Sequence, residues 1–114
     1  MKATIYHNPR CSKSRQALAL LADKQIETEV HEYLKSPLNS SELTELIKLL
    51  GVNAHDLLRT KEAEYKEAGL SKDSSESEII AALCNTPKLM ERPIVVTEKG
   101  ARIGRPTEAI EEIL

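Results

Sequence analysis

Hydrophobic and polar residues follow the periods of a mixed α/β protein in the first third of the chain. Residues 3–6 form a short apolar run that predicts a buried strand. Residues 12–24 predict a helix, because Leu18 and Leu21 have the spacing of one helical face. Residues 28–34 carry β-branched and aromatic side chains and predict a second strand. A strand, a helix and a strand in this order predict a βαβ unit with a right-handed crossover.

The middle of the chain has only helical patterns. Asn39 with Glu42, and Ser75 with Glu78, have the spacing of capping boxes that open helices. Apolar residues at helical spacing follow each pair, and Gly51 is expected to end the first helix. Two shorter helices are expected between these two, at residues 55–59 and 61–68. Residues 36–88 are therefore expected to form an all-helical insert.

The last part of the chain returns to strand patterns. Residues 94–97 and 101–103 predict a hairpin, and Pro106 is expected to begin a terminal helix. Without the insert the order is β-α-β…β-β-α, which is that of a thioredoxin-like core. We expect an α/β fold of this kind, with the helical insert between its halves, in a single domain of residues 1–114. The Arg92–Pro93 bond opens the third strand, where such folds keep a cis-proline, so we predict that it is cis.

Composition excludes several classes of function. The net charge is −2, and the chain has three Tyr but no Phe or Trp, so neither a basic surface nor stacking platforms for nucleic acid are expected. No apolar run approaches membrane-spanning length, and the N-terminus lacks the apolar core of a signal peptide. We expect a cytoplasmic protein that binds neither nucleic acid nor membranes.

The two cysteines, Cys11 and Cys84, are far apart in sequence. Two thiols make no disulfide framework, and no Cys-His cluster has zinc spacing, so we expect no structural metal site. Cys84 lies on an apolar helical stripe with Ile80 and Leu83, which predicts a residue of the core.

Cys11 has a different setting, because the loop before it delivers its thiol to the first turn of a helix. Unpaired backbone N–H groups there carry partial positive charge, and they can also cradle an oxyanion. Such surroundings, with cationic neighbours, lower a cysteine pKa from about 8.5 to roughly 3.5–7.5. The neighbours that are cationic or potentially so are His7, Arg10, Lys13 and Arg15. The sequence therefore predicts a nucleophilic thiolate beside an anion site.

Four motifs together resemble the glutaredoxin-coupled arsenate reductases of bacteria. They are H-N-P-R-C-S-K-S-R at residues 7–15, L-L-R-T at 57–60, E-R-P-I-V-V at 91–96 and R-I-G-R-P at 102–106. The resemblance covers the whole chain, the insert included. It implies that the enzyme converts arsenate to arsenite, with glutathione as co-substrate, glutaredoxin as partner and no bound cofactor.

The resemblance also implies roles for individual residues. Cys11 would be the nucleophile, and His7 and Ser14 would lower its pKa or support the thiolate. The expected oxyanion ligands are Arg59, Arg92 and Arg105. Arginine suits this task because its forked guanidinium pairs with a tetrahedral oxyanion through two donors. Arg15, on the first helical turn, either touches the anion or forms an ion pair.

Two residues, Ser14 and Gly104, occupy positions at which other proteins carry a cysteine. Ser14 stands three residues after Cys11, so no C-x-x-C disulfide can form and the electrons must come from outside thiols. Gly104 replaces a cysteine that some family members carry.

Two alternative functions remain: a glutathione-dependent thiol oxidoreductase without arsenate activity, and a regulator of RNA polymerase like the Spx-type proteins. The latter typically sense oxidants through the C-x-x-C pair that Ser14 removes.

Overall fold

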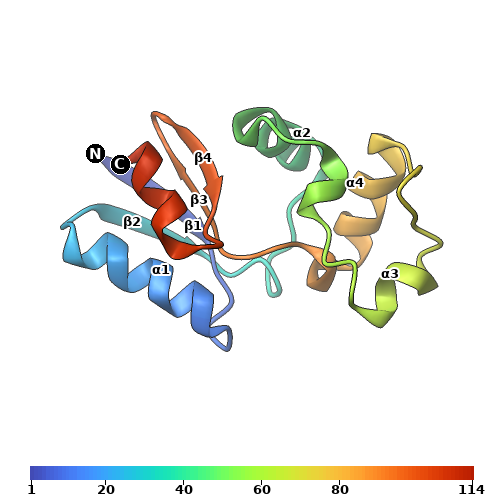
Figure 1. The fold of residues 1–114 in the computed structure, drawn as a ribbon, viewed down its shortest axis with the longest axis horizontal. Coiled ribbons are helices and arrows are strands. Elements are labelled where there is room, and N and C mark those ends of the chain that lie inside the picture. The colour runs from blue at the N-terminus through green and yellow to red at the C-terminus, as the bar shows by residue number, and fades with distance from the viewer. The chain divides into compact units, whose positions relative to one another are not determined.

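The computed structural model describes residues 1–114, which divide into two compact units. The first unit is discontinuous and comprises Met1–Ser36 and Arg92–Leu114, whereas Pro37–Glu91 form the second. All but the first residue of the expected insert therefore lie in the second unit. That the two units form a single domain remains a prediction. The elements (Figure 1) are β1 Lys2–Tyr6, α1 Ser12–Asp23, β2 Glu27–His31, α2 Ser40–Leu50, the 3-10 helix η1 Ala54–Leu57, α3 Ala63–Glu67, α4 Glu76–Asn85, the 3-10 helix η2 Pro87–Leu89, β3 Ile94–Thr97, β4 Gly100–Ile103 and the 3-10 helix η3 Thr107–Ile113.

The first unit contains a four-stranded sheet in the order β2-β1-β3-β4. Strand β1 runs parallel to β2 and antiparallel to β3, and β4 pairs with β3 as a hairpin. This is the thioredoxin-like arrangement that the order of elements predicted.

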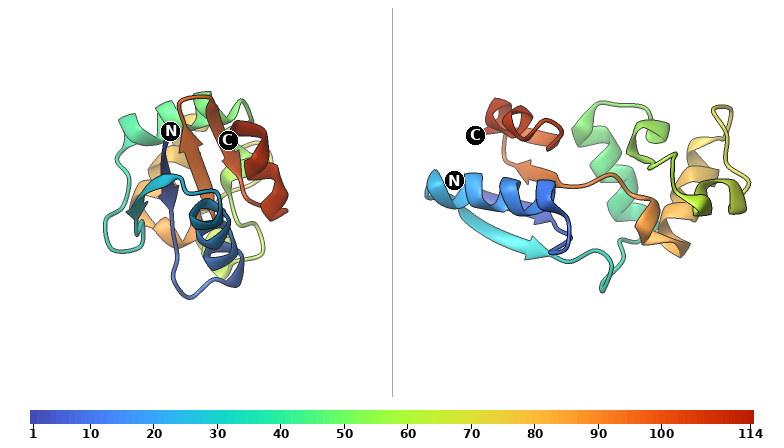
Figure 2. Two further views of the ribbon diagram at one scale, coloured as in Figure 1. Left: turned by 90° about the vertical axis from the view of Figure 1, so that its left-hand side faces the viewer. Right: turned by 60° about the horizontal axis from the view of Figure 1, so that its bottom comes forward.

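Alternate residues of the central strands build the core of this unit. Ala3 and Ile5 of β1 and Val95 of β3 are fully buried on one face of the sheet. Helix α1 packs on that face through Ala17 and Leu21, and η3 does so through its two buried isoleucines, Ile110 and Ile113. Figure 2 shows these two helices beside each other on the sheet. The first turn of α1 is thereby fixed at the end of β1.

The second unit is helical, as predicted, and its helix ends follow from local side chains. Both capping boxes are present, with Asn39 bonded to Glu42 and Ser75 to Glu78 in both directions. Gly51 ends α2 in the left-handed conformation, with φ 67°. Helices α2 and α4 are in contact, and each buries an apolar face. The buried residues are Leu43, Leu46, Ile47 and Leu50 of α2, and Ile79, Ile80 and Leu83 of α4.

Several predicted boundaries are wrong. Strand β2 ends at His31 and not at residue 34, because the chain turns there and Glu32 C=O accepts bonds from the N–H groups of Lys35 and Ser36. The terminal helix begins after Pro106 and is a 3-10 helix. The helix expected at 55–59 is η1, which stops at Leu57 because Leu58 pairs with Met90 as an isolated β-bridge. None of the helices combines the length and the apolar content that crossing a membrane requires.

Candidate active site

Cys11 is the N-cap residue of α1 and has extended backbone angles, φ −92° and ψ 123°. Its N–H donates to the carbonyl of Asn8 at 3.0 Å, and its own carbonyl accepts the first helical bond, from Arg15, at 3.0 Å. The residue is 9% exposed. Its thiol is thus held at the mouth of a helix while part of its surface stays open.

The loop before Cys11 is braced by Asn8 and Ser14. The Asn8 side chain accepts from the N–H of Arg10 at 3.0 Å, and the N–H of Asn8 donates to Ser14 Oγ at 3.0 Å. Ser14 is fully buried, and the bond is partly shielded from water. Sequence reasoning did not single out Asn8, although an asparagine before a proline is a typical turn signal.

The pKa of the Cys11 thiol is lowered from its ordinary value. Burial is the largest single influence and raises this pKa, because it disfavours the charged thiolate. Hydrogen bonds from the backbone N–H groups of Ser14 and Lys13 lower it, as do the charges of Arg92 and Arg105. These four influences together outweigh burial. Two of them come from the helix terminus and two from the far end of the sequence.

Arg105 and Arg92 are joined to each other and to the thiol. Arg105 Nη2 lies 3.7 Å from Cys11 Sγ, and Arg105 Nε donates to the backbone carbonyl of Arg92 at 2.7 Å. The Nε and Nη1 atoms of Arg92 are buried and have no hydrogen-bond partner within the protein. Buried guanidinium donors without acceptors are costly, so they favour an anionic acceptor at this place. Both residues precede cis-prolines; the Arg92–Pro93 bond was predicted to be cis, whereas Arg105–Pro106 was not.

His7 contacts the loop through Ser14. Its Nδ1 lies 2.7 Å from Ser14 Oγ, and the residue is 6% exposed. Burial lowers the pKa of His7; the carboxylate of Glu32 raises it and the charge of Arg15 lowers it, with a net decrease. The lowered pKa favours the uncharged form of the His7 imidazole at neutral pH.

The remaining two predicted arginines lie in different places. Arg15 donates from Nη1 to the carbonyl of Pro9 at 3.0 Å, so it ties the loop to the first turn of α1. Arg59 belongs to the second unit, where its guanidinium pairs with Glu62 at 2.8 Å and with Glu91 at 3.8 Å. A part for Arg59 in anion binding stays a prediction.

Gly104 packs against the proline that follows Arg92. A Cβ atom at this position would lie 2.9 Å from Pro93 Cγ and 2.9 Å from Ile110 Cδ1. The N–H of Gly104 also donates to the carbonyl of Pro93 at 2.8 Å. A side chain at this position therefore requires its neighbours to move.

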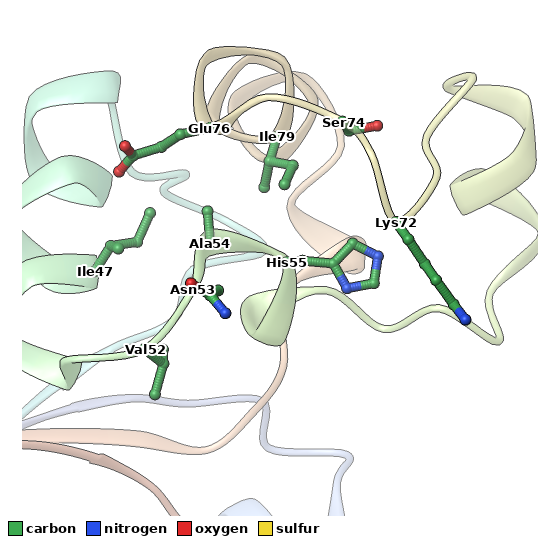
Figure 3. A pocket seen from close by; sticks show the side chains of 9 residues that line it. All are labelled: Ile47, Val52, Asn53, Ala54, His55, Lys72, Ser74, Glu76 and Ile79. Atoms are coloured by element: carbon green, nitrogen blue, oxygen red, sulfur yellow. The ribbon is translucent and has the colours of Figure 1, made fainter.

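The insert has a pocket of its own, of about 390 Å³ (Figure 3). Its lining includes Asn53, His55, Lys72 and Glu76, but no cysteine and no arginine. Figure 3 shows the charged ends of Lys72 and Glu76 at opposite ends of the pocket. Because these polar groups do not converge on one point, the pocket offers no site for the chemistry expected of Cys11.

Comparisons with known proteins show which family and which solved structures this chain is similar to. The model of the ArsC family matches residues 6–113. The chain is 53% identical to the uncharacterized protein YfgD of Escherichia coli (strain K12), over 96% of this chain and 94% of that protein. It is 44% identical to an arsenate reductase of Neisseria meningitidis, over 96% of both chains. The solved structure of an arsenate reductase from Vibrio cholerae superimposes with a TM-score of 0.96 at 46% identity, covering 100% of this chain and 98% of that one.

Proposed function

Because this chain belongs to the ArsC family, we propose that it is an arsenate reductase with Cys11 as its only catalytic thiol. Glutathione and glutaredoxin supply the electrons. The observation that carries the proposal is the setting of Cys11 Sγ: the pKa of its thiol is lowered, and Arg105 Nη2 lies 3.7 Å away.

The anion-binding part of the proposal rests on Arg92 and Arg105. Arsenate is mainly a dianion at neutral pH, so it needs cationic donors in fixed directions. Arg92 has two buried donors without protein acceptors, and Arg105 is oriented by its bond to the Arg92 carbonyl. The N–H groups at the start of α1 add partial positive charge at the same place.

The reaction begins with a substitution that changes no oxidation state. The Cys11 thiolate attacks arsenic, and one arsenate oxygen takes up protons and leaves as water. The thiol of glutathione then replaces a second oxygen in the same way. Arsenic(V) is now bonded to the Cys11 sulfur and to the glutathione sulfur.

The redox step needs a second outside thiol. A glutaredoxin thiolate attacks the glutathione sulfur, and a disulfide between glutathione and glutaredoxin forms. The electron pair of the broken sulfur–arsenic bond passes to arsenic, which becomes arsenic(III). Water then cleaves the remaining bond to Cys11, so that arsenite leaves and the thiol is regenerated.

The positions of the cysteines in the chain support a mechanism in which the other two sulfurs come from glutathione and glutaredoxin. Ser14 occupies the position at which a C-x-x-C pair would have its second cysteine. The other cysteine of the chain, Cys84, belongs to α4 in the other compact unit. An internal relay through Cys84 forms no part of the proposal.

The test is NADPH consumption in the presence of arsenate, glutathione, glutaredoxin and glutathione reductase. We expect turnover that requires all of these components and that Cys11→Ser removes. A rate equal to that without enzyme would reject arsenate reduction. Thiol–disulfide exchange without arsenate turnover would favour a glutathione-dependent oxidoreductase instead.

A further inference from the structure

Two sets of donors lie around the Cys11 sulfur, and they come from different parts of the sequence. The backbone N–H groups of Lys13 and Ser14, at the start of α1, donate to the sulfur itself. Arg105 Nη2 lies 3.7 Å from Sγ, which exceeds the usual distance of about 2.7–3.2 Å between a nitrogen donor and an oxygen acceptor. An oxygen atom bonded to the sulfur on this side would therefore be close enough to accept a hydrogen bond from Arg105.

Arg92 provides donors that have no acceptor. Its Nε and Nη1 atoms are buried and have no hydrogen-bond partner in the protein. Arg92 is close to the thiol, because its charge is one of those that lower the pKa of Cys11, and its backbone carbonyl accepts from Arg105 Nε at 2.7 Å. Leaving such donors unpaired is costly, so the site favours a small ligand that carries oxygen atoms.

The sulfur is accessible only to a small reagent. Cys11 is 9% exposed, so little of its surface is open to solvent. Oxidation of a cysteine requires the thiolate, and the lowered pKa of Cys11 increases the share of thiolate at neutral pH. A small oxidant with two oxygen atoms therefore matches the size of the opening, the reactivity of the sulfur and the donors of both arginines.

We propose that the Cys11 thiolate also reduces hydrogen peroxide, with Arg92 and Arg105 donating to the peroxide oxygens. This activity uses the site of the proposed function, but it requires neither arsenate nor glutaredoxin. Negative charge develops on the leaving oxygen as the oxygen–oxygen bond breaks. Cationic donors that are already in place stabilise this charge and so lower the barrier.

The first stage of the reaction oxidises the sulfur. The Cys11 thiolate attacks one peroxide oxygen, a sulfur–oxygen bond forms, and the oxygen–oxygen bond breaks. Hydroxide leaves and takes up a proton from the solvent to become water. The sulfur loses two electrons, the peroxide gains them, and Cys11 becomes a sulfenic acid.

A small thiol such as glutathione completes the cycle. Its sulfur attacks the sulfenic sulfur, water leaves, and a mixed disulfide with Cys11 forms. A second small thiol then attacks the sulfur of the first, which releases the Cys11 thiolate and a disulfide of the two small thiols. The sulfenic acid persists until such a thiol arrives, because Cys11 is the only cysteine of the first unit.

The experiment measures the first stage in a Cys84→Ser background, where Cys11 is the only thiol. Hydrogen peroxide is added, dimedone captures the sulfenic acid, and mass spectrometry follows the adduct over time. We expect Cys11 to react at least about tenfold faster than the thiolate of free cysteine, because cationic donors face the leaving oxygen. Every rate is measured above the pH midpoint of alkylation, so that the thiolate is fully formed.

Arg92→Gln and Arg105→Gln test the donors. Each variant should slow the peroxide reaction about tenfold, which is the effect of losing one hydrogen bond to a charged group. Iodoacetamide alkylates the same thiolate without breaking an oxygen–oxygen bond, so its rate should fall much less. Arg102→Gln removes the same charge from β4, where Arg102 faces Glu112, and is the matched control with no loss expected.

Three results would overturn the proposal: a rate no higher than that of free cysteine, unchanged rates in both arginine variants, or equal losses with peroxide and iodoacetamide. Equal losses would mean that the arginines affect only access to the thiolate. None of these measurements contains arsenate. Sulfenic acid formation without arsenate turnover would keep this activity and reject the proposed function, and arsenate turnover without it would do the opposite.

Discussion

The two cysteines of the chain lie at opposite kinds of helix end. Cys11 is at the N-terminal end of α1, and Cys84 is at the C-terminal end of α4. Cys11 caps the N-terminus of α1, where backbone N–H groups point at its sulfur, and Arg105 lies 3.7 Å from it. Cys84 lies in the last turn of α4, where a helix presents carbonyl oxygens. The sequence predicted Cys84 for the core, but it is only partly buried. Exposure alone would therefore favour Cys84 as the reactive thiol, whereas the direction of the nearby backbone dipoles favours Cys11.

The largest effect is expected from Cys11→Ser. A serine hydroxyl is a far poorer nucleophile at neutral pH, so arsenate turnover should fall to the rate without enzyme. The measurement is NADPH consumption in the coupled assay. Residual turnover in this variant would mean that Cys84, and not Cys11, is the reactive thiol.

Arg92→Lys should be the next most damaging change. Lysine keeps the charge but not the forked donors, and a hydrogen bond to a charged group is worth about 1.5–3 kcal/mol. We expect kcat/KM for arsenate to fall roughly tenfold to a hundredfold. Arg102→Lys on β4 is the matched control and should behave as wild type, because Arg102 faces Glu112. Full activity of Arg92→Lys would show that Arg92 acts only as a point charge.

Alkylation of Cys11 against pH isolates the electrostatic part of its setting. The lowered pKa means that thiolate persists to lower pH, so the midpoint of iodoacetamide reactivity should lie below that of free cysteine. Arg105→Gln removes a charge that lowers this pKa, so the midpoint should move to higher pH. The Cys84→Ser background leaves one thiol to follow. An unchanged midpoint would assign the effect to the N–H groups of α1 and the charge of Arg92.

Gly104→Ala tests the packing behind Arg92. The added methyl group meets Pro93 and Ile110 at 2.9 Å, and overpacking of this kind costs about 1–3 kcal/mol. Urea unfolding of the variant and the wild type would measure the loss. Wild-type stability would mean that the Ile110 side chain moves aside at little cost.

The smallest effect is expected from Cys84→Ser. The residue is partly exposed, so the added polarity should be tolerated and arsenate turnover should remain within about twofold of wild type. A complete loss would reveal an internal relay between the cysteines.

Features set by neighbouring residues could be predicted from the sequence. Both capping boxes, the left-handed Gly51 and the position of Cys11 at the start of α1 depend on side chains a few residues apart. The end of β2 could not be predicted, because apolar and aromatic residues continue past His31 and only the turn at Glu32 ends the strand. Periodicity likewise does not distinguish a 3-10 from an α-helical terminus.

The candidate site shows the same limit. The sequence identified Cys11, His7, Ser14, Arg92 and Arg105, and the structure brings all five together in the first unit. The sequence did not indicate that His7 is buried and that its pKa is lowered, since a buried and a solvated histidine look alike in a sequence. Such properties depend on contacts between residues that are distant along the chain.

The separation of 94 residues between Cys11 and Arg105 has a consequence for biosynthesis. Ribosomes release the N-terminus first, so Cys11 leaves the exit tunnel long before β3 and Arg105 are translated. During that interval neither the Arg92 nor the Arg105 guanidinium group lies beside the Cys11 thiol. The charges of Arg92 and Arg105 therefore begin to lower the pKa of the Cys11 thiol only when the final fifth of the polypeptide docks.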